Sequence, residues 1–336
     1  MLLCEVTINA VLNRVSNEYI GSLTHPWHRR ILQFGPITYG IYRSYGGFMK
    51  FDTGSISFTP ELFENDWPPP LSCPLTVKYT STTEEAAETI LTANLHIEEI
   101  TREQVVYGLY RTAYADVLPD ATAFTAASQI DTLALVFGAC CTILGIDLDI
   151  TLARNPSPAV EYTTSGEQLI VDFLDGIAAG YTHMAYIDIA GTTLYLIDML
   201  DKDNGSRTLT EYEYLGVENV SNPVRYYWDP PIGIAKAGDF SAVSSYTYGT
   251  EESVTAYHDT QANIETALAD IITVANRARA ELPIPFAGDV PDPAEKITFP
   301  DTSNVADLST YIRTRTLTYD FDNEEVIIDG DGVISK

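Results

Sequence analysis

The chain has 336 residues, enough for two or three domains, and its 45% hydrophobic residues exclude wholesale disorder. Its 47 acidic and 19 basic residues give a net charge of −28 at pH 7. That charge disfavours binding to free nucleic acid, which needs Lys and Arg to neutralise phosphates. The imbalance is local: residues 1–60 hold three acids and five bases, whereas residues 116–225 hold sixteen acids and four bases. The acidity serves solubility or, on a sharper hypothesis, forms a wall along which DNA slides without binding.

Residues 1–118 predict a β-rich domain, a small barrel or sandwich. Residues 31–60 are rich in aromatic and β-branched side chains and are punctuated by Gly35-Pro36, Gly46-Gly47 and Thr53-Gly54, which is typical of short antiparallel strands. We expect further strands at 75–82 and within 98–114. Between them, we expect a short helix from Glu84 to Ala93, capped by Thr82 or Thr83.

Residues 119–227 predict an α+β domain of two helix–strand units. Ser128 is expected to cap a buried, apolar helix over 129–145 that ends at Gly145, followed by a strand at 146–151. Ser165 is expected to cap a second helix that ends at Gly180, and a hairpin with its turn at Ala190-Gly191 follows. One face of the second helix is apolar, and the opposite face is acidic. The apolar face holds Leu169, Ile170, Phe173, Leu174 and Ile177, and the acidic face holds Glu167, Asp172 and Asp175.

Residues 228–336 predict a mixed final segment. Asn222–Pro231 is interpreted as a linker and 241–258 as strand, and Thr260 or Asp259 is expected to cap a long helix to about Leu282. Its apolar stripe is Ile264, Leu268, Ile271, Ile272 and Ala275. The proline-rich residues 282–300 then predict an irregular arm. A closing hairpin, with Leu317, Tyr319 and Phe321 on one face, a turn at Asp322-Asn323 and a second strand at Val326–Ile328, is expected to pack back onto the first β domain.

Candidate catalytic and metal-binding groups are weak. Asp201, Asp203 and Gly205 suggest a calcium-binding loop. An EF-hand loop needs Gly at position six and Glu at position twelve. Counted from Asp201, this chain has Gly205 at position five and Tyr212 at position twelve. Asn204-Gly205 is more simply a hairpin turn, and Asp329-Gly-Asp331-Gly is interpreted as another turn.

The histidines and cysteines also predict no site. His25 and His28 have no acidic third ligand nearby in sequence, and His258-Asp259 has no G-x-S-x-G nucleophile to serve. The four cysteines, Cys4, Cys73, Cys140 and Cys141, form no CxxC pair and are expected to be reduced, with the last two in a helix core. We therefore predict no catalytic, cofactor-binding or metal-binding residue, no secretory signal and no membrane insertion.

Three segments, 45–70, 166–214 and 311–332, together resemble the tail-hub (baseplate or tail-tip hub) proteins of long-tailed bacteriophages. The first is similar to their tube-type β domain, the second to their helix-plus-hairpin hub domain and the third to their closing hairpin. The resemblance implies an α+β structural protein of the virion, assembled in the host cytoplasm, with no enzymatic activity and no cofactor.

The resemblance also implies a ring, usually a homotrimer, that closes the tail tube at the tail tip. Its partners would be the tail tube or distal tail protein, a tail fibre or central spike protein and the tape measure protein, and DNA would only pass through it. Two alternatives stay open: a receptor- or carbohydrate-binding tail module, and a tail-associated hydrolase of cell wall or glycan.

Overall fold

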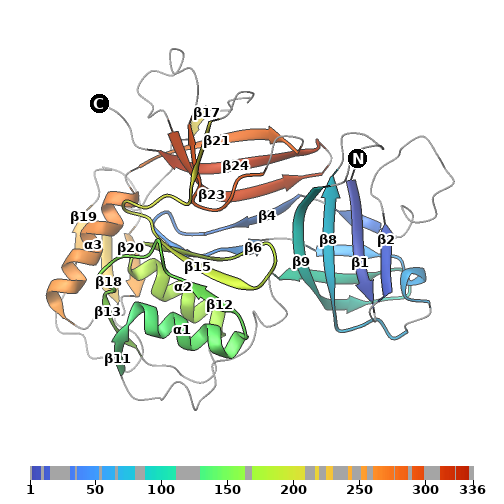
Figure 1. The fold of residues 1–336 in the computed structure, drawn as a ribbon, viewed down its shortest axis with the longest axis horizontal. Helices are drawn as coiled ribbons and strands as arrows, with labels where there is room; N and C mark the ends of the chain where they lie inside the picture. Colours follow the sequence, from blue (N-terminus) through green and yellow to red (C-terminus); the bar gives the residue numbers. More distant parts are fainter. Residues whose placement is uncertain are drawn as a thin grey trace.

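The computed structural model describes residues 2–8, 11–15, 31–34, 36–52, 55–64, 67–79, 88–110, 129–162, 169–208, 216–218, 225–229, 241–243, 251–255, 260–275, 277–286, 290–298, 311–321 and 323–332. Figure 1 shows two bodies side by side, a curved sheet with the N-terminus on the right and a larger mixed body on the left. The described part holds three α-helices and twenty-four strands, which confirms the predicted α+β class.

The right-hand body is a seven-stranded antiparallel sheet in the order β2-β1-β8-β9-β10-β7-β3. Its strands are Leu2–Ile8 (β1), Val11–Val15 (β2), Ile31–Phe34 (β3), Ser55–Phe58 (β7), Ser72–Tyr79 (β8), Glu88–Ile100 (β9) and Val105–Tyr110 (β10). Every second residue of β8 from Cys73 to Val77 is buried, as expected when one face of a sheet covers a core. The N-terminal part of the chain is therefore rich in strands, as predicted.

The helix predicted from Glu84 to Ala93 is wrong from Glu88 onward, and residues 84–87 lie outside the described part of the chain. Residues from Glu88 belong to β9, which pairs with β8 from Glu88 to His96. Buried Leu91 and Ala93 alternate with the half-buried Thr92, a period of two. A long-range strand partner overrides local helix preference here.

Residues 31–60 form short strands, as predicted, but the strands belong to three different sheets. β3 and β7 are part of the seven-stranded sheet, whereas Ile37–Gly40 (β4) and Lys50–Asp52 (β6) pair with each other and leave it. Between them, Gly47–Phe48 (β5) joins a four-stranded sheet. Residues 31–60 therefore contribute strands to both bodies and connect them.

The four-stranded sheet has the order β12-β15-β14-β5, with Asp147–Asp149 (β12), His183–Ile187 (β14) and Thr193–Asp198 (β15). The predicted hairpin β14–β15 is confirmed, and Gly191 occupies its turn with φ 71°. Helices Leu133–Leu144 (α1) and Ile170–Gly180 (α2) share a hydrophobic core with this sheet. Figure 1 places both helices below it.

Helix α1 ends as predicted but begins later. Gly145 terminates it with φ 69°, and Thr132 is the N-cap, accepting a 3.4 Å hydrogen bond from the amide of Leu135. Residues Gln129–Thr132 form a strand (β11) paired with Ala159–Tyr162 (β13), and Ser128 lies outside the described residues. Burial all around the helix was also a wrong expectation, because the Leu135 side chain is 62% exposed.

An eight-stranded sheet carries the closing hairpin in the order β16-β22-β23-β24-β21-β17, with β4 and β6 attached through β23. Its remaining strands are Ser206–Thr208 (β16), Gly216–Glu218 (β17), Ala278–Pro285 (β21), Lys296–Thr298 (β22), Tyr311–Asp320 (β23) and Glu325–Gly332 (β24). Leu317, Tyr319 and Phe321 are buried, as predicted. The hairpin returns to N-terminal residues by pairing with β4, which is not part of the seven-stranded sheet.

Two predicted turns differ from the structure. Asp329 and Asp331 lie inside β24, where pairing with β21 and β23 places them in the middle of a sheet. The chain does turn at Asn204-Gly205, and Gly205 has φ 79°. The turn leads into β16, however, which pairs in parallel with β22 and does not return to β15.

Helix α3 spans Gln261–Ala275, and Thr260 caps it by accepting a 3.2 Å hydrogen bond from the amide of Asn263. Its apolar stripe is buried as predicted, except that Ile272 is only half-buried. The helix stops before Leu282, because residues from Ala278 are drawn into the ladder with β24.

Part of the predicted arm and part of the predicted linker are strands. β21 contains Pro283 and Pro285. On the edge of β21 opposite β24, the described strand β17 pairs only with residues 279–281, so neither proline meets a described partner there. A proline, which has no amide hydrogen to donate, is tolerated at such an edge. Residues 290–295 are irregular, as expected. Arg225–Asp229, expected as linker, is a strand (β18) between Ser241–Val243 (β19) and Glu251–Thr255 (β20), and α3 packs against β18 and β19.

One large hydrophobic core spans the two bodies. It joins the inner face of the seven-stranded sheet to the eight-stranded sheet and to α3. Among the described residues, no helix combines the length and the apolar character needed to cross a membrane.

Candidate functional site at the junction of the sheets

Residues 43–50, which we call the strap, run between β4 and β6 and insert β5 beside β14. Gly46 has φ 151° and Gly47 has φ 144°, a region that residues with a side chain rarely adopt. A Cβ on Gly47 would lie 2.6 Å from Oδ1 of Asp175, and a Cβ on Gly46 would lie 2.7 Å from the carbonyl oxygen of His183. The strap therefore reaches α2 and β14 only because both residues are glycine.

Polar contacts fix the strap to α2 and to the four-stranded sheet. Arg43 Nη1 lies 2.5 Å from Oδ2 of Asp175, and the amide of Phe48 donates a 2.8 Å hydrogen bond to Oδ1 of the same carboxylate. Lys50 Nζ donates to Asp172 at 2.6 Å. Asp172 is exposed, as predicted, but Asp175 was wrongly placed on the solvent face of α2. It is buried because the strap covers it and satisfies both of its oxygens.

A second group of charges joins three segments around Arg154. Its guanidinium binds Asp198 through Nε at 2.9 Å and Nη2 at 3.1 Å, and it reaches Asp270 of α3 at 2.8 Å. Nη2 also donates to the Thr182 hydroxyl at 3.0 Å. Such a bidentate contact is the strong form of an ion pair, so Arg154 ties α3 to the β14–β15 hairpin.

His183 lies under this group and is completely buried. Its Nε2 accepts a 3.2 Å hydrogen bond from the amide of Arg154, and its Nδ1 lies 2.7 Å from the carbonyl oxygen of Tyr181. Burial is the main reason that the pKa of His183 falls to about 4, and the neighbouring Asp198 only partly opposes it. The imidazole is therefore neutral and acts as a structural acceptor.

A third group surrounds the closing hairpin. Arg277 donates to the carbonyl oxygens of Met199 at 2.6 Å and Leu200 at 2.7 Å, and to Asp331 Oδ2 at 3.2 Å. Arg313 also binds Met199 O at 3.0 Å. Asp331 is 1% exposed, and its Oδ1 has no hydrogen-bond partner among the described residues. These arginines fasten the end of β15 to β23 and β24.

The two aspartates of the calcium hypothesis, Asp201 and Asp203, have different surroundings. Asp203 pairs with Arg313, whereas Asp201 is exposed and its carboxylate lies 3.9 Å from Nζ of Lys202. In the described ranges, no three His, Cys, Asp or Glu side chains are grouped so that they could hold a metal ion. Asp203 therefore serves as an anchor for the closing hairpin.

The remaining histidines and cysteines carry no assembled chemistry in the described residues. His96 packs edge-on against Tyr110 with ring centres 4.8 Å apart, whereas His25, His28 and His258 lie outside those residues. Cys73, Cys140 and Cys141 are buried as free thiols, and Cys4 is described only by its backbone. Burial raises the pKa of Cys73 to about 12 and that of Cys140 further, so both are poor nucleophiles.

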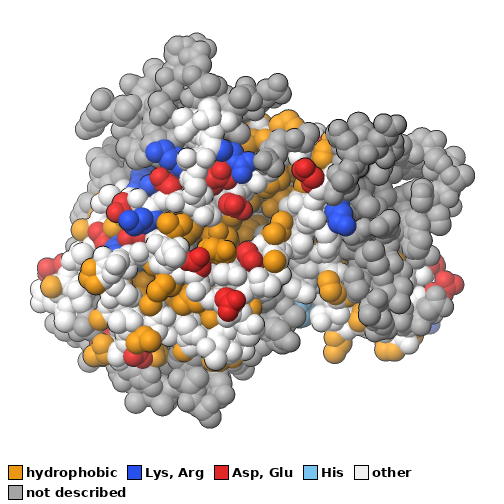
Figure 2. Space-filling model, viewed as in Figure 1, with side chains coloured by type: hydrophobic (Ala, Val, Ile, Leu, Met, Phe, Trp, Pro, Cys, Tyr) orange, Lys and Arg blue, Asp and Glu red, His pale blue; other side chains and the backbone are white. Residues whose placement is uncertain are grey.

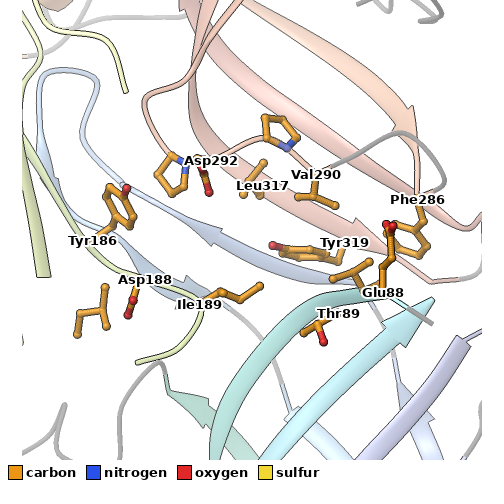
Figure 3. Close-up of a pocket in the computed structure, with 14 residues that line it drawn as sticks. Glu88, Thr89, Tyr186, Asp188, Ile189, Phe286, Val290, Asp292, Leu317 and Tyr319 are labelled. Carbon is orange, nitrogen blue, oxygen red and sulfur yellow. The ribbon is translucent and has the colours of Figure 1, made fainter. Parts of the chain in front are cut away.

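A pocket of about 180 Å³ lies where the two bodies meet, and we call it the junction pocket. Its walls come from the start of β9, the β14–β15 turn, residues 290–293 and β23. Figure 3 shows Tyr319 and Ile189 between these walls, with Glu88, Asp188 and Asp292 placed around them. In Figure 2, hydrophobic side chains line the hollow between the two bodies. The pocket is therefore lined by both hydrophobic and carboxylate side chains.

Solved structures resemble the whole chain. The 43 kDa tail protein of prophage MuSo2 from Shewanella oneidensis matches with a TM-score of 0.54 and 10% identity, over 100% of this chain and 99% of that one. The fold is that of phage tail proteins. A tail protein from Neisseria meningitidis MC58 matches with a TM-score of 0.54 and 8% identity, over 98% of this chain and 96% of that one. The resemblance to phage tail proteins predicted from the sequence is therefore confirmed for the fold.

The matches to tail proteins are matches of structure at low sequence identity. No protein-family model and no curated protein sequence matches the chain. Sequence patterns missed the strap and the arginine groups, because their partners lie far away along the chain. Gly46-Gly47 was the one local signal: two adjacent glycines in a strand-rich stretch mark a close approach of backbone to another element.

Proposed function

We propose that this chain is a structural subunit of a phage tail. Several copies would form a hub ring at the tail tip that closes the tail tube and links it to a fibre or spike. The observation that carries the proposal is the end-to-end correspondence with two phage tail proteins, which covers nearly all of each chain. In this proposal, residues 1–118 supply the tube-type domain, residues 119–227 the hub domain and residues 228–336 the segment that closes the structure. The proposal assigns no catalytic residue and no cofactor.

Exposed apolar residues support a role in assembly. Trp67 is 56% exposed and Leu71 is 78% exposed, in a proline-rich loop at one end of the seven-stranded sheet. The loop is held by hydrogen bonds from Tyr107 to the Pro70 carbonyl at 2.9 Å and from the Ile97 amide to the Leu71 carbonyl at 2.9 Å. A rigid apolar loop of this kind suits a protein interface, since little conformational entropy is lost when it is covered.

The strap, the Arg154 group and the closing hairpin support a load-bearing role. Each holds together segments that are more than 100 residues apart, such as Arg43 and Asp175 or Arg154 and Asp270. A subunit that transmits force between a tube and a fibre needs its bodies joined at several points. We propose that the acidic surface keeps DNA moving through the ring, since carboxylates repel phosphates over about one Debye length, roughly 8 Å.

The decisive experiment is the mass of the purified full chain in solution, with imaging of any ring. We expect a homotrimer of about 111 kDa, three times the 37.0 kDa chain, visible as a three-fold ring alone or with its tail tube partner. Leu71→Asp should prevent assembly while leaving the melting temperature unchanged, and Gln261→Asp, at another exposed position on α3, should affect neither. A chain that stays monomeric at high concentration and with tail tube protein present would contradict the proposal.

A further inference from the structure

Helix α1 presents an uncharged face to the surface. None of its 12 residues is charged, although the whole chain carries a net charge of −28. One side of the helix lies in the hydrophobic core that it shares with α2 and the four-stranded sheet. On the opposite side, the Leu135 side chain is 62% exposed. A surface helix of an acidic protein normally turns charged residues to water, so an uncharged outward face indicates contact with another protein.

Exposed hydrophobic side chains are concentrated on α1 and close to its ends in the chain. Of the eight large hydrophobic side chains that are exposed in the described residues, three belong to this stretch: Ile130 of β11, Leu135 of α1 and Ile150 after β12. Figure 2 shows hydrophobic and other uncharged side chains at the lower left of the visible face, where Figure 1 places α1 and β11. The apolar surface is therefore wider than the helix alone.

The outward face of α1 carries both a knob and a hole. Leu135, Gly138, Ala139 and Thr142 stand at positions i, i+3, i+4 and i+7, the four positions that surround one inserted side chain when helices pack together. Leu135 is the large side chain of this group, and the two small residues leave a hollow in its middle. A Cβ added to Gly138 would meet only Leu148, at 3.9 Å, among the described residues. The hollow is therefore open to a side chain from outside.

The polar side chains on and beside this face are already engaged within the chain. The Thr142 hydroxyl donates a 2.9 Å hydrogen bond to the carbonyl oxygen of Gly138. Asp131, just before the helix, accepts a 3.1 Å hydrogen bond from the Tyr162 hydroxyl. Covering the face therefore breaks neither bond and costs little desolvation. Because α1 carries no charge, it neither attracts an oppositely charged partner nor repels a like-charged one.

We propose that the outward face of α1 binds the same face of a second copy, with the two helices antiparallel about a two-fold axis. Leu135 of each copy enters the hole formed by Gly138, Ala139 and Thr142 of the other. A second copy fits because knob and hole lie on one face, which makes that face self-complementary. Two chains that each carry −28 also repel each other least where neither presents a charge.

The contact is small and goes beyond the proposed hub ring. An interface below about 1,200 Å² is typical of weak association, so we expect a pair that is populated at roughly 100 µM chain and dissociates on dilution. A two-fold contact cannot close a three-fold ring, because it pairs one patch with itself. It would therefore join two free chains or two assembled rings.

Self-crosslinking of the full chain tests the contact. Ala139 lies close to the proposed axis, so the thiols of two Ala139→Cys chains should meet and form a disulfide under mild oxidation. We expect a covalent dimer on a denaturing gel that contains no reductant. Ala269→Cys, at an exposed position on α3, is the matched control and should remain uncrosslinked. The unmodified chain shows the background from its own cysteines, of which Cys73, Cys140 and Cys141 are buried.

Sedimentation of surface variants gives a second measurement. Leu135→Asp removes the knob and places a charge in each hole, so it should abolish the pair. Thr273→Asp adds the same charge at an exposed position on α3 and should leave the pair intact. Leu135→Ala, which changes no charge, should weaken pairing by at least about tenfold, because one buried leucine side chain per copy is lost. Circular dichroism melts show whether each variant is folded.

Three outcomes would overturn the proposal. One is an Ala139→Cys chain that forms no more covalent dimer than Ala269→Cys. Another is an equal loss of pairing in both aspartate variants, which would indicate general charge repulsion. The third is a Leu135→Asp chain of unchanged mass and lower melting temperature, because the chain itself would then cover the face. A chain that forms the Ala139→Cys dimer but no ring would support the α1 contact while contradicting the hub ring, and a ring without this crosslink would do the reverse.

Discussion

The backbone amide of Phe48 donates a 2.8 Å hydrogen bond to the carboxylate of Asp175, 127 residues further along the chain. This bond lies where the strap passes over α2. Through it, helix α2 holds strand β5 in place. Because Asp175 also holds Arg43 at 2.5 Å, one buried carboxylate binds the strap at both Arg43 and Phe48. Substitutions at this contact should therefore lower the stability of the fold.

Gly47→Ala should destabilise the protein by roughly 1–3 kcal/mol, the usual cost of a strained backbone conformation. The new Cβ would lie 2.6 Å from Oδ1 of Asp175, at φ 144°. Urea unfolding followed by circular dichroism measures the change. Gly138→Ala in α1 is the matched control, since its Cβ would meet only Leu148 at 3.9 Å, and it should be neutral or slightly stabilising. Equal stability of the two variants would show that the strap tolerates a side chain.

Asp175→Asn should cost about 1.5–3 kcal/mol, because a buried carboxylate that accepts two hydrogen bonds loses its charge beside Arg43. Asp172→Asn should cost less than about 0.5 kcal/mol, since the Asp172 side chain is 53% exposed and its ion pair with Lys50 is screened by water. Both free energies of unfolding come from the same urea titration. Similar losses for the two variants would mean that the Asp175 contact contributes no more than a surface pair.

Stability should fall as the pH drops from 6.5 toward 4, because of His183. Its ordinary pKa is 6.5 and its pKa in the fold is about 4, so over this range the unfolded chain takes up a proton that the folded chain does not. The loss is up to about 1.4 kcal/mol for each pH unit. His183→Gln, which keeps an acceptor near the Arg154 amide, should flatten this part of the stability–pH profile. An unchanged slope would show that other groups dominate it.

Below pH 4 a second loss should begin at Asp198. Burial alone would raise the pKa of Asp198, but the hydrogen bonds and charge of Arg154 outweigh burial and hold that pKa below 3.8. Its contribution is therefore fully present above pH 3.8 and is lost as the pH falls further. Arg154→Met should remove this acid-range loss while lowering stability at neutral pH, as measured by urea unfolding at each pH.

Leu174→Asp should abolish soluble, folded protein. Leu174 is fully buried in the core between α2 and the four-stranded sheet, where its side chain contributes roughly 1.5–3 kcal/mol and an unpaired charge costs several more. Leu135→Asp on α1, where the side chain is 62% exposed, is the control and should remain folded. If both variants melt like the unmodified chain, Leu174 contributes nothing to the core.

The purified protein should show no affinity for double-stranded DNA even at low salt, because of its net charge of −28. Fluorescence anisotropy with a labelled duplex at two salt concentrations measures this. In an assembled ring, the inner face should be net negative, with its acids drawn largely from residues beyond 60. A salt-dependent DNA complex, or a ring with a basic lumen, would contradict the hypothesis that the acidic residues keep DNA moving through the ring.

Local patterns in the sequence determined the elements whose signals lie within a few residues of one another. Gly145 ends α1, Gly191 turns the β14–β15 hairpin, and alternating Leu317, Tyr319 and Phe321 define one strand of the closing hairpin. In each case a glycine conformation or a period of two acts on adjacent residues, so no distant partner is needed. The resemblance of three such segments to phage tail hubs predicted the fold of phage tail proteins, which the structural comparison confirms.

Tertiary structure alone decided the rest, because those choices depend on partners far away along the chain. Residues from Glu88 form a strand because they pair with β8. Pro283 can lie in β21 because, among the described strands, it pairs only with β24, on one edge. Asp175 looked like a solvent-facing acid until the strap, more than 120 residues earlier, covered it. Periodicity shows which face of a helix is polar, but only the folded chain decides whether that face meets water or a buried backbone amide.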